Sequence, residues 1–266
     1  MRDKYLAMSR IAFSERLAYP GEAALILASA GARIFLAWLL WSAVLPGGAG
    51  RSEAGGMDLA ALVSYYLVAS GLRTLDRSEG YAWEFAAEIR SGAFSKYLAR
   101  PVDPMRCFLA VSAGRGAWQA CLVLAFGAAA ALVIGPRALP HPAGLAWALP
   151  ILALGLIALA LLNYLTSLLA FAFQDITPFH MVKNELVDFL SGTLVPLAMM
   201  PGWARAALAW TPFPALASLP ARLWTGEGLA EAPRALALLI AWVAALALAS
   251  RLALGALAPR YEEAGS

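Results

Sequence analysis

Long stretches of apolar residues, separated by short polar connections, recur along this chain of 266 residues. The stretches are rich in Ala, Leu, Val and Ile, and they do not alternate between apolar and polar residues as outer-membrane strands do. A helix needs about 20 apolar residues to cross the hydrocarbon core of a bilayer. The pattern therefore predicts an all-α polytopic membrane protein, folded as a single transmembrane domain over residues 1–266.

Six stretches are expected to cross the membrane as helices. They lie at roughly 23–45, 57–75, 107–134, 144–173, 186–200 and 233–257. The fifth is short and the fourth is longer than the hydrocarbon core requires, so we expect tilted or protruding helices. Six crossings place both termini on one side of the membrane.

Lys and Arg are distributed unequally between the two sides. Most lie in the N-terminal segment and in the connection between the second and third stretches: Arg2, Lys4, Arg10, Arg16, Arg73, Arg77, Arg90, Lys96, Arg100 and Arg106. Three connections on the other side share Arg51, Arg137, Arg205, Arg222 and Arg234. Because cytoplasmic segments carry the excess of Lys and Arg, we expect both termini and the long Arg-rich connection to be cytoplasmic.

The N-terminal segment, residues 2–17, is too polar to span the membrane. Its apolar side chains fall near one helical face, with Arg and Glu side chains opposite. These apolar residues are Tyr5, Met8 or Ala12, Ile11 and Leu17. The pattern predicts a helix that lies in the inner membrane interface before the first span.

The cytoplasmic connection contains a second segment that does not span, residues 84–104. Its apolar residues recur at mixed helical spacings: Phe85, Ile89, Phe94 and Leu98. Ser91 and Gly92 interrupt this pattern, and Pro101 and Pro104 end it. We therefore predict two short helical pieces around a turn.

Residues 201–226 form a third such segment, apolar but broken by prolines. The prolines are Pro201, Pro212, Pro214 and Pro220, and the tryptophans of the segment are Trp203, Trp210 and Trp224. A lipid-exposed irregular chain is unstable in the hydrocarbon core, whereas tryptophan is enriched at headgroup depth. We predict a re-entrant or interfacial segment on the outer side.

Composition excludes several classes of function. The chain is 61% hydrophobic and 14% charged, and its formal net charge of +3 is too small to suggest nucleic-acid binding. It contains no phosphate-binding loop, nucleophile elbow, HExxH pair or CxxC motif, and Cys107 and Cys121 have no metal-binding spacing. We predict no catalytic, cofactor-binding or metal site in this chain.

Polar residues within the apolar stretches are candidates for lining a substrate path. They are Arg33, Tyr65, Tyr66 and Asn163. A charge at the depth of Arg33 costs roughly 2.5–3.5 kcal/mol and normally faces protein or water. The alternatives are snorkelling or a structural ion pair for Arg33, and for Arg115 likewise, and interhelical hydrogen bonds for the uncharged residues.

Two segments together resemble one family of membrane proteins. Glu88, Ser91, Gly92, Leu98, Arg100 and Pro101, within EIRSGAFSKYLARPVDP, resemble the cytoplasmic turn between the second and third spans of ABC-2 type ATP-binding-cassette exporter permeases. Phe189–Gly226 is similar to that family's outer progression of Ser-Gly, prolines and Gly, with Thr211 before Pro212 where Leu is common. The order of interfacial helix, six spans and outer re-entrant segment also resembles the family.

The resemblance implies the membrane subunit of an exporter in a bacterial inner membrane. Two six-span subunits would form the pathway, and separate cytoplasmic ATPase chains would bind ATP and Mg²⁺, so that this chain holds no cofactor. We expect a heterodimer, with a homodimer as the alternative, because related permeases are often encoded in pairs. Membrane lipid is a further expected partner and nucleic acid is not.

The cytoplasmic connection is the predicted contact with the ATPase. Its coupling residues are expected to be Glu88, Arg90, Ser91, Gly92, Phe94, Leu98, Arg100 and Pro101. We expect Phe94 and Leu98 to insert into a groove of the ATPase, while Glu88, Arg90 and Arg100, together with Lys96, make charged contacts.

The predicted function is export of an amphipathic or hydrophobic compound from the cytoplasm or inner leaflet. One alternative is an integral membrane enzyme or assembly factor that uses Asp175, His180 and Glu185 at the inner surface. The other is an ion-coupled secondary transporter, although no acidic residue lies deep in a predicted span and no internal repeat is evident.

Overall fold

The structure is a computed structural model that describes residues 2–17, 20–44, 59–99, 102–134 and 141–264. The described residues contain helices and no strands, which confirms the all-α prediction. In chain order the α-helices are α1 (Arg2–Leu17), α2 (Pro20–Val44), α3 (Leu59–Arg73), α4 (Ser78–Arg90), α5 (Ser95–Leu98), α6 (Pro104–Ile134), α7 (Pro142–Leu168), α8 (Thr177–Ser191), α9 (Gly202–Leu208), α10 (Ser218–Trp224) and α11 (Ala232–Ala264). Short 3₁₀ helices cover Leu169–Phe171, Leu197–Met199 and Phe213–Leu216.

Three of the described helices carry segments long and apolar enough to cross a membrane. These segments are Pro104–Leu124 in α6, Pro142–Phe171 at α7, and Ala232–Ala258 in α11. Helices α2 and α3 fall at the first and second predicted stretches. Six crossings remain a prediction.

The predicted position of the fifth span, residues 186–200, is wrong. Helix α8 begins at Thr177 and ends at Ser191, where Gly192 adopts a left-handed conformation with φ of 87°. The N–H groups of Thr193 and Leu194 then donate to the Asp188 carbonyl at 3.1 and 3.3 Å, which closes the helix end. The apolar sequence continues past this point, but the helix does not.

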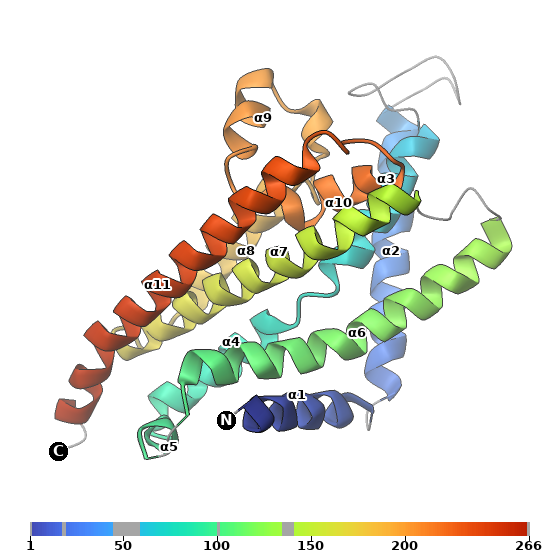
Figure 1. The fold of residues 1–266 in the computed structure, drawn as a ribbon. Helices are drawn as coiled ribbons and strands as arrows, with labels where there is room; N and C mark the ends of the chain where they lie inside the picture. Colours follow the sequence, from blue (N-terminus) through green and yellow to red (C-terminus); the bar gives the residue numbers. More distant parts are fainter. Residues whose placement is uncertain (1, 18–19, 45–58, 100–101, 135–140, 265–266) are drawn as a thin grey trace.

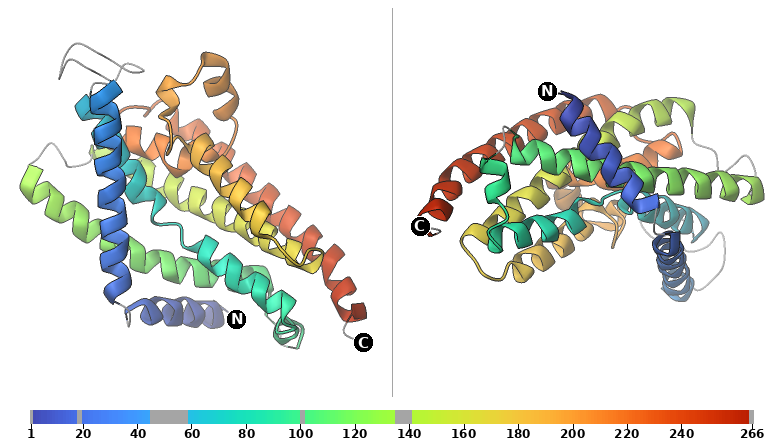
Figure 2. Two further views of the ribbon diagram at one scale, coloured as in Figure 1. Left: turned by 180° about the vertical axis from the view of Figure 1, so that it is seen from behind. Right: turned by 90° about the horizontal axis from the view of Figure 1, so that it is seen from below.

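Different helices lie at the two ends of the molecule (Figure 1). Helices α1, α4 and α5 lie at one end, together with the C-terminal end of α11. Helix α9 and the N-terminal end of α11 lie at the opposite end. Helix α11 runs beside α7, and α1 runs beneath α6, as both views show (Figure 2).

Aromatic rings form the core in which α4 is held between α6 and α7. Phe85 of α4 is fully buried, and its ring centroid lies 5.4 Å from that of Tyr164 and 5.7 Å from that of Phe108. Phe94 and Tyr97 extend the cluster, with centroids 6.0 and 5.6 Å from Phe85. Edge-to-face and tilted contacts of this kind each add about 0.5–1.5 kcal/mol beyond the burial of their area.

Helix α1 packs directly on α6 at a glycine. A Cβ atom on Gly114 would lie 2.1 Å from the carbonyl oxygen of Ser9, so only glycine permits this approach. Ala12 of α1 is buried and Tyr5 is half-buried in this contact, whereas Ile11 is exposed. Residues 2–17 therefore form the predicted helix, but Ile11 does not lie on its buried face.

The proline-rich segment 201–226 folds into short helices joined by turns, and its re-entrant or interfacial position remains a prediction. Helix α10 packs against α7 and α3, with Leu219 and Leu223 buried. Trp203 and Trp210 are exposed by 77% and 62%. One part of the segment thus belongs to the core, and the other presents tryptophan at the surface.

Candidate functional site

The connection between α3 and α6 folds as two helices around a tight turn, which matches the prediction from Ser91 and Gly92. Gly92 has a φ of 85°, a conformation that residues with a Cβ rarely adopt. The Ser91 N–H donates to the Ala87 carbonyl at 2.9 Å, and the Phe94 N–H donates to the Glu88 carbonyl at 3.1 Å. These bonds close the end of α4 and direct the chain back along it.

Glu88 joins the two sides of this turn. Its carboxylate accepts hydrogen bonds from the Lys96 ammonium at 2.6 Å and from the Tyr97 hydroxyl at 3.0 Å. Burial raises the pKa of the Tyr97 phenol, so this residue remains a neutral donor. Glu88 is therefore engaged within the chain and fixes α5 against α4.

The outer face of this turn is exposed. We call it the α4–α5 tip, and it consists of Arg90, Ser91, Gly92, Ala93, Ser95 and Lys96. The Arg90 guanidinium donates to the Gln174 carbonyl at 3.4 Å, which places the turn between α7 and α8 beside the tip. The tip thus presents two cationic side chains and exposed backbone.

Phe94 does not lie on this exposed face. Its side chain is 0% exposed, and its ring meets those of Phe85, Tyr97 and Phe171. This contradicts the prediction that Phe94 inserts into a partner's groove, because the amphipathic face on which it lies turns toward the protein core. Leu98 is in α5 but its side chain is not among those described, and Arg100 and Pro101 lie outside the described residues.

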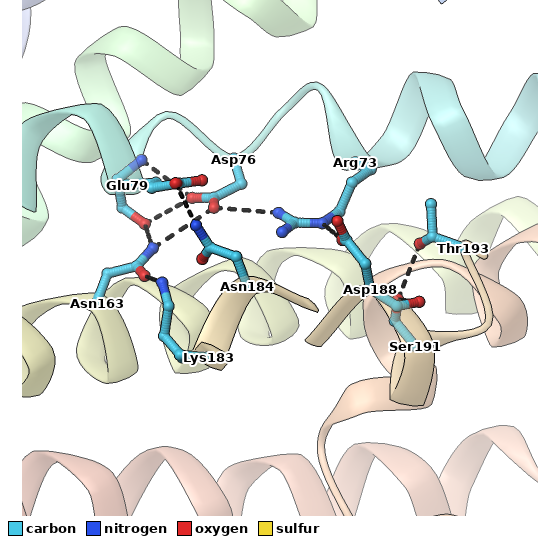
Figure 3. A network of polar contacts seen from close by, with 10 residues as sticks. Arg73, Asp76, Glu79, Asn163, Lys183, Asn184, Asp188, Ser191 and Thr193 are labelled. Atoms are coloured by element: carbon cyan, nitrogen blue, oxygen red, sulfur yellow. Dashed lines mark hydrogen bonds and ion pairs between the residues drawn. The ribbon is translucent and has the colours of Figure 1, made fainter. Parts of the chain in front are cut away.

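A network of polar side chains connects the start of α4 with α3, α7 and α8 (Figure 3). Arg73, at the end of α3, donates through Nε to Asp188 of α8 at 2.6 Å and through Nη1 to Asp76 at 3.2 Å. Asp76 in turn accepts from the backbone N–H of Ser78 at 3.0 Å and from its hydroxyl at 2.5 Å. These contacts tie the α3–α4 junction to α8.

The network continues through Asn163 of α7, whose side chain is fully buried. Its amide donates to the Ser78 hydroxyl at 2.7 Å, and its carbonyl oxygen accepts from Lys183 of α8. Asn184, the next residue of α8, donates to the Glu79 carboxylate of α4. Figure 3 shows both α8 side chains reaching across to the α3–α4 junction and α7.

A second ion pair joins the middle of α4 to α6. Arg115 donates to Glu84 in a bidentate arrangement, with distances of 2.8 and 2.7 Å, and its guanidinium lies 5.0 Å from the Tyr81 ring centroid. The Arg115 side chain is 8% exposed. Of the two roles that the sequence leaves open for Arg115, the structure supports the structural ion pair.

Comparison with protein families decides what kind of protein carries this arrangement. The family model described as ABC-2 family transporter protein matches residues 33–265, most of the chain. The chain belongs to the ABC-2 transporter family. This ABC-2 protein is the membrane component, a permease and not an ATPase. Comparisons with curated proteins and with solved structures found no match.

The candidate path residues of this ABC-2 permease occupy different places. Tyr65 and Tyr66 donate to the carbonyls of Gly192 and Leu194 at 2.9 and 2.8 Å, and so hold the chain that follows α8. Asn163 belongs to the polar network. Arg33 lies in α2, and its side chain is outside what the structure describes.

The residues of the alternative enzyme hypothesis do not form a site together. His180 is buried against Trp83, with ring centroids 4.4 Å apart, and neither ring nitrogen has a hydrogen-bond partner in the described part of the chain. Asp175 is exposed, and hydrogen bonds from the side chain and backbone of Thr177 lower the pKa of its carboxyl. Glu185 is exposed on α8, and the described residues contain no group of three or more His, Cys, Asp or Glu that suits a metal ion.

Proposed function

We propose that this ABC-2 permease exports an amphipathic or hydrophobic compound and that a separate cytoplasmic ATPase drives it by docking on the α4–α5 tip. The supporting observation is that the tip is exposed, while Glu88 and the buried Phe94 hold it through contacts within the chain. Arg90 presents positive charge, Lys96 is exposed but paired with Glu88, and the turn at Gly92 presents backbone. A partner with an acidic rim around a shallow groove suits this surface.

Helix α4 is suited to carry a force from the tip into the membrane domain. Its aromatic residues pack on α6 and α7, the Glu84–Arg115 pair fixes its middle to α6, and Glu79 receives a hydrogen bond from Asn184 of α8. Closely packed interiors yield little to compression and transmit displacement. We propose that closure of the ATPase moves α4 with α8 as one unit.

The orientation and assembly belong to the same proposal. Helices α1, α4 and α5 and the C-terminal end of α11 share one end of the molecule, which agrees with the excess of Lys and Arg there. We place this end in the cytoplasm and the segment 201–226 on the outer side of a bacterial inner membrane. A second six-span permease, in a heterodimer or a homodimer, would complete the pathway.

Charge reversal at the tip tests ATPase docking. The double variant Arg90→Glu and Lys96→Glu reverses two exposed charges. Because Lys96 also pairs with Glu88 at 2.6 Å, the single variant Arg90→Glu, which keeps that pair, is measured beside it. We expect a loss of at least tenfold in the amount of ATPase that co-purifies with the permease, and a similar loss of export, at equal membrane abundance. Each desolvated charged contact of this kind contributes roughly 1.5–3 kcal/mol to the free energy of binding. A tenfold change in affinity corresponds to about 1.4 kcal/mol, so the loss of two contacts should exceed it.

Lys4→Glu combined with Arg10→Glu is the matched control, because both side chains are exposed on α1 at the same end of the molecule but lie outside the tip. It makes a like change of charge and should leave ATPase association near the unmodified level. If the tip variant keeps full ATPase association and export, the docking proposal fails. If both variants lose association equally, the effect is one of general charge and the tip is not the docking site.

A further inference from the structure

A cavity of about 690 Å³ lies at the end of the molecule opposite the α4–α5 tip. It is open to the surface and is lined by residues of α9, α10 and α11, by the 3₁₀ helices Leu197–Met199 and Phe213–Leu216, and by Tyr65 of α3. Its volume falls within the range of roughly 300–1,000 Å³ that is typical of small-molecule sites. It does not overlap the polar network or the tip.

Three arginines and two glutamates line this cavity. They are Arg205, Arg222, Arg234, Glu227 and Glu231. Arg222 is neutralised by Glu231, whose carboxylate oxygens lie 3.0 and 3.1 Å from its guanidinium nitrogens. The remaining groups are two guanidinium groups and one carboxylate, so the cavity carries an excess of positive charge.

Arg234 is held in position by an aromatic ring. Its guanidinium lies 4.2 Å from the ring centroid of Trp210, and the Trp210 carbonyl accepts a hydrogen bond from the indole of Trp242 at 2.9 Å. Stacking uses the face of the guanidinium and leaves the N–H groups on its edge available for an oxyanion. Among the described residues, no carboxylate forms an ion pair with Arg234 or with Arg205.

The rest of the cavity wall is mostly apolar. It includes Pro196, Ala206, Ala209, Leu238 and Leu239, with Thr211 and Ser218 as uncharged polar groups. A ligand that satisfies both parts of the wall therefore needs an anionic group and a hydrocarbon segment.

The surrounding surface indicates the depth of the cavity in the membrane. Trp203 and Trp210 are largely exposed on the same segment, and exposed tryptophan is enriched at the level of lipid headgroups. Arg side chains at this depth meet phosphate and carboxylate groups. This step rests on the orientation given in the proposed function.

We infer that this cavity binds an amphipathic anion. Arg205 and Arg234 hold its phosphate, sulfate or carboxylate group, and the apolar wall formed by Ala206, Ala209 and Leu238 contacts its hydrocarbon segment. Two sources provide this chemistry: an anionic phospholipid of the outer leaflet, and the exported compound on its way out.

Binding is tested on the purified, full-length permease in a neutral detergent, without the ATPase. The probes are octyl phosphate, octyltrimethylammonium and inorganic phosphate, and calorimetric titration gives their dissociation constants. We expect octyl phosphate to bind at least tenfold more tightly than either of the other two, because they lack the charge or the tail. Equal binding of the cation and the anion would overturn the inference.

Variants locate the site. Arg205→Gln combined with Arg234→Gln should weaken octyl phosphate binding at least tenfold. The melting temperature should fall only slightly, because both side chains are exposed and only the Arg234–Trp210 stacking is lost. The matched control is Lys4→Gln combined with Arg10→Gln, which removes two exposed cationic side chains of α1 at the opposite end of the molecule and should bind normally. Unchanged binding by the double variant, or an equal loss in the control, would reject the site.

Two further measurements distinguish the sources. If the ligand is a lipid, phosphatidylglycerol should co-purify with the native permease and be lost from the double variant. If it is the exported compound, octyl phosphate should stimulate ATP turnover of the reconstituted complex, and the double variant should not respond. Because binding is measured without the ATPase, failure of ATPase docking leaves this inference standing, and failure of binding leaves docking standing.

Discussion

Replacement of Arg73 by Met should destabilise the permease more than any exposed ion-pair variant, because this residue joins α3 to α8. Its side chain is 13% exposed and contacts Asp188 at 2.6 Å and Asp76 at 3.2 Å. Methionine replaces the aliphatic part of the arginine side chain without charge or donors. The substitution therefore removes the ion pairs and leaves most of the packing.

The expected magnitude follows from the burial of the two carboxylates. Truncating one partner of a buried ion pair costs about 3–5 kcal/mol, because a buried charge is left unpaired. The Asp76 side chain is 3% exposed but keeps two hydrogen bonds from Ser78, and Asp188 is 32% exposed and can recruit water. Both features reduce the loss, so we expect about 3 kcal/mol for Arg73→Met.

A graded series makes the prediction specific. Asp188→Asn keeps an oxygen that accepts from Arg73 and removes only charge, so it should cost about 1 kcal/mol. Arg106→Met is the matched control, because Arg106 pairs with Asp103 at 3.4 Å but is 58% exposed, and exposed pairs contribute about 0–1 kcal/mol.

The assay is thermal unfolding of the purified variants in one neutral detergent. A loss of about 3 kcal/mol corresponds to a drop in melting temperature of roughly 6–12 °C for a protein of this size, and the control should drop by less than about 4 °C. If Arg73→Met and Arg106→Met have the same melting temperature, the α3–α8 ion pair does not stabilise the fold. If Asp188→Asn costs as much as Arg73→Met, charge and not geometry accounts for the whole effect.

Two further predictions concern packing and orientation. Gly114→Leu should separate α1 from α6, because even a Cβ atom there lies 2.1 Å from the Ser9 carbonyl oxygen; we expect a loss of about 1–3 kcal/mol, measured by thermal unfolding, and native stability would refute the close contact. In a background without the native cysteines, Ser95→Cys should be protected from an impermeant thiol reagent applied to whole cells and Gly202→Cys should be labelled, since both positions are exposed at opposite ends; the reverse pattern would refute the proposed orientation.

The elements that the sequence predicts well are those fixed by local chemistry. The turn at Gly92 requires a left-handed backbone conformation, which glycine supplies, and Pro104 begins α6 as the pattern of breakers suggests. The broken segment 201–226 likewise follows from its four prolines. In each case the decisive residues are adjacent in the chain.

The position of α8 could not be obtained from hydropathy. Apolar residues continue from Leu194 to Met200, and hydropathy reports only that they avoid water, not that they are helical. The end of the helix is set by Gly192 and by bonds to the Asp188 carbonyl. The Ser-Gly pair followed by Pro196 is the local signal that would have placed the end correctly.

The polar network was missed for a different reason. Arg73 and Asp188 are 115 residues apart, and Glu79 and Asn184 are 105 residues apart. A pattern over neighbouring residues cannot predict contacts between positions so distant in the sequence. From the sequence, Arg73 is predicted only to be one of the cytoplasmic charges. For Phe94, the helical spacing identified an apolar face but could not say whether it turns toward the core or toward a partner.

The contacts also define a continuous route between the two proposed sites. Glu79 of α4 meets Asn184 of α8, and the end of α8 at Gly192 is held by Tyr65, which lines the cavity opposite the tip. A displacement of α4 that preserves these contacts has to move the end of α8 relative to the cavity wall, or break the Tyr65 bond. Spatial continuity alone is not coupling. A movement of α8 that keeps Tyr65 bonded to Gly192 would, however, displace one residue of the cavity wall, and this is the contact through which the tip could act on the cavity.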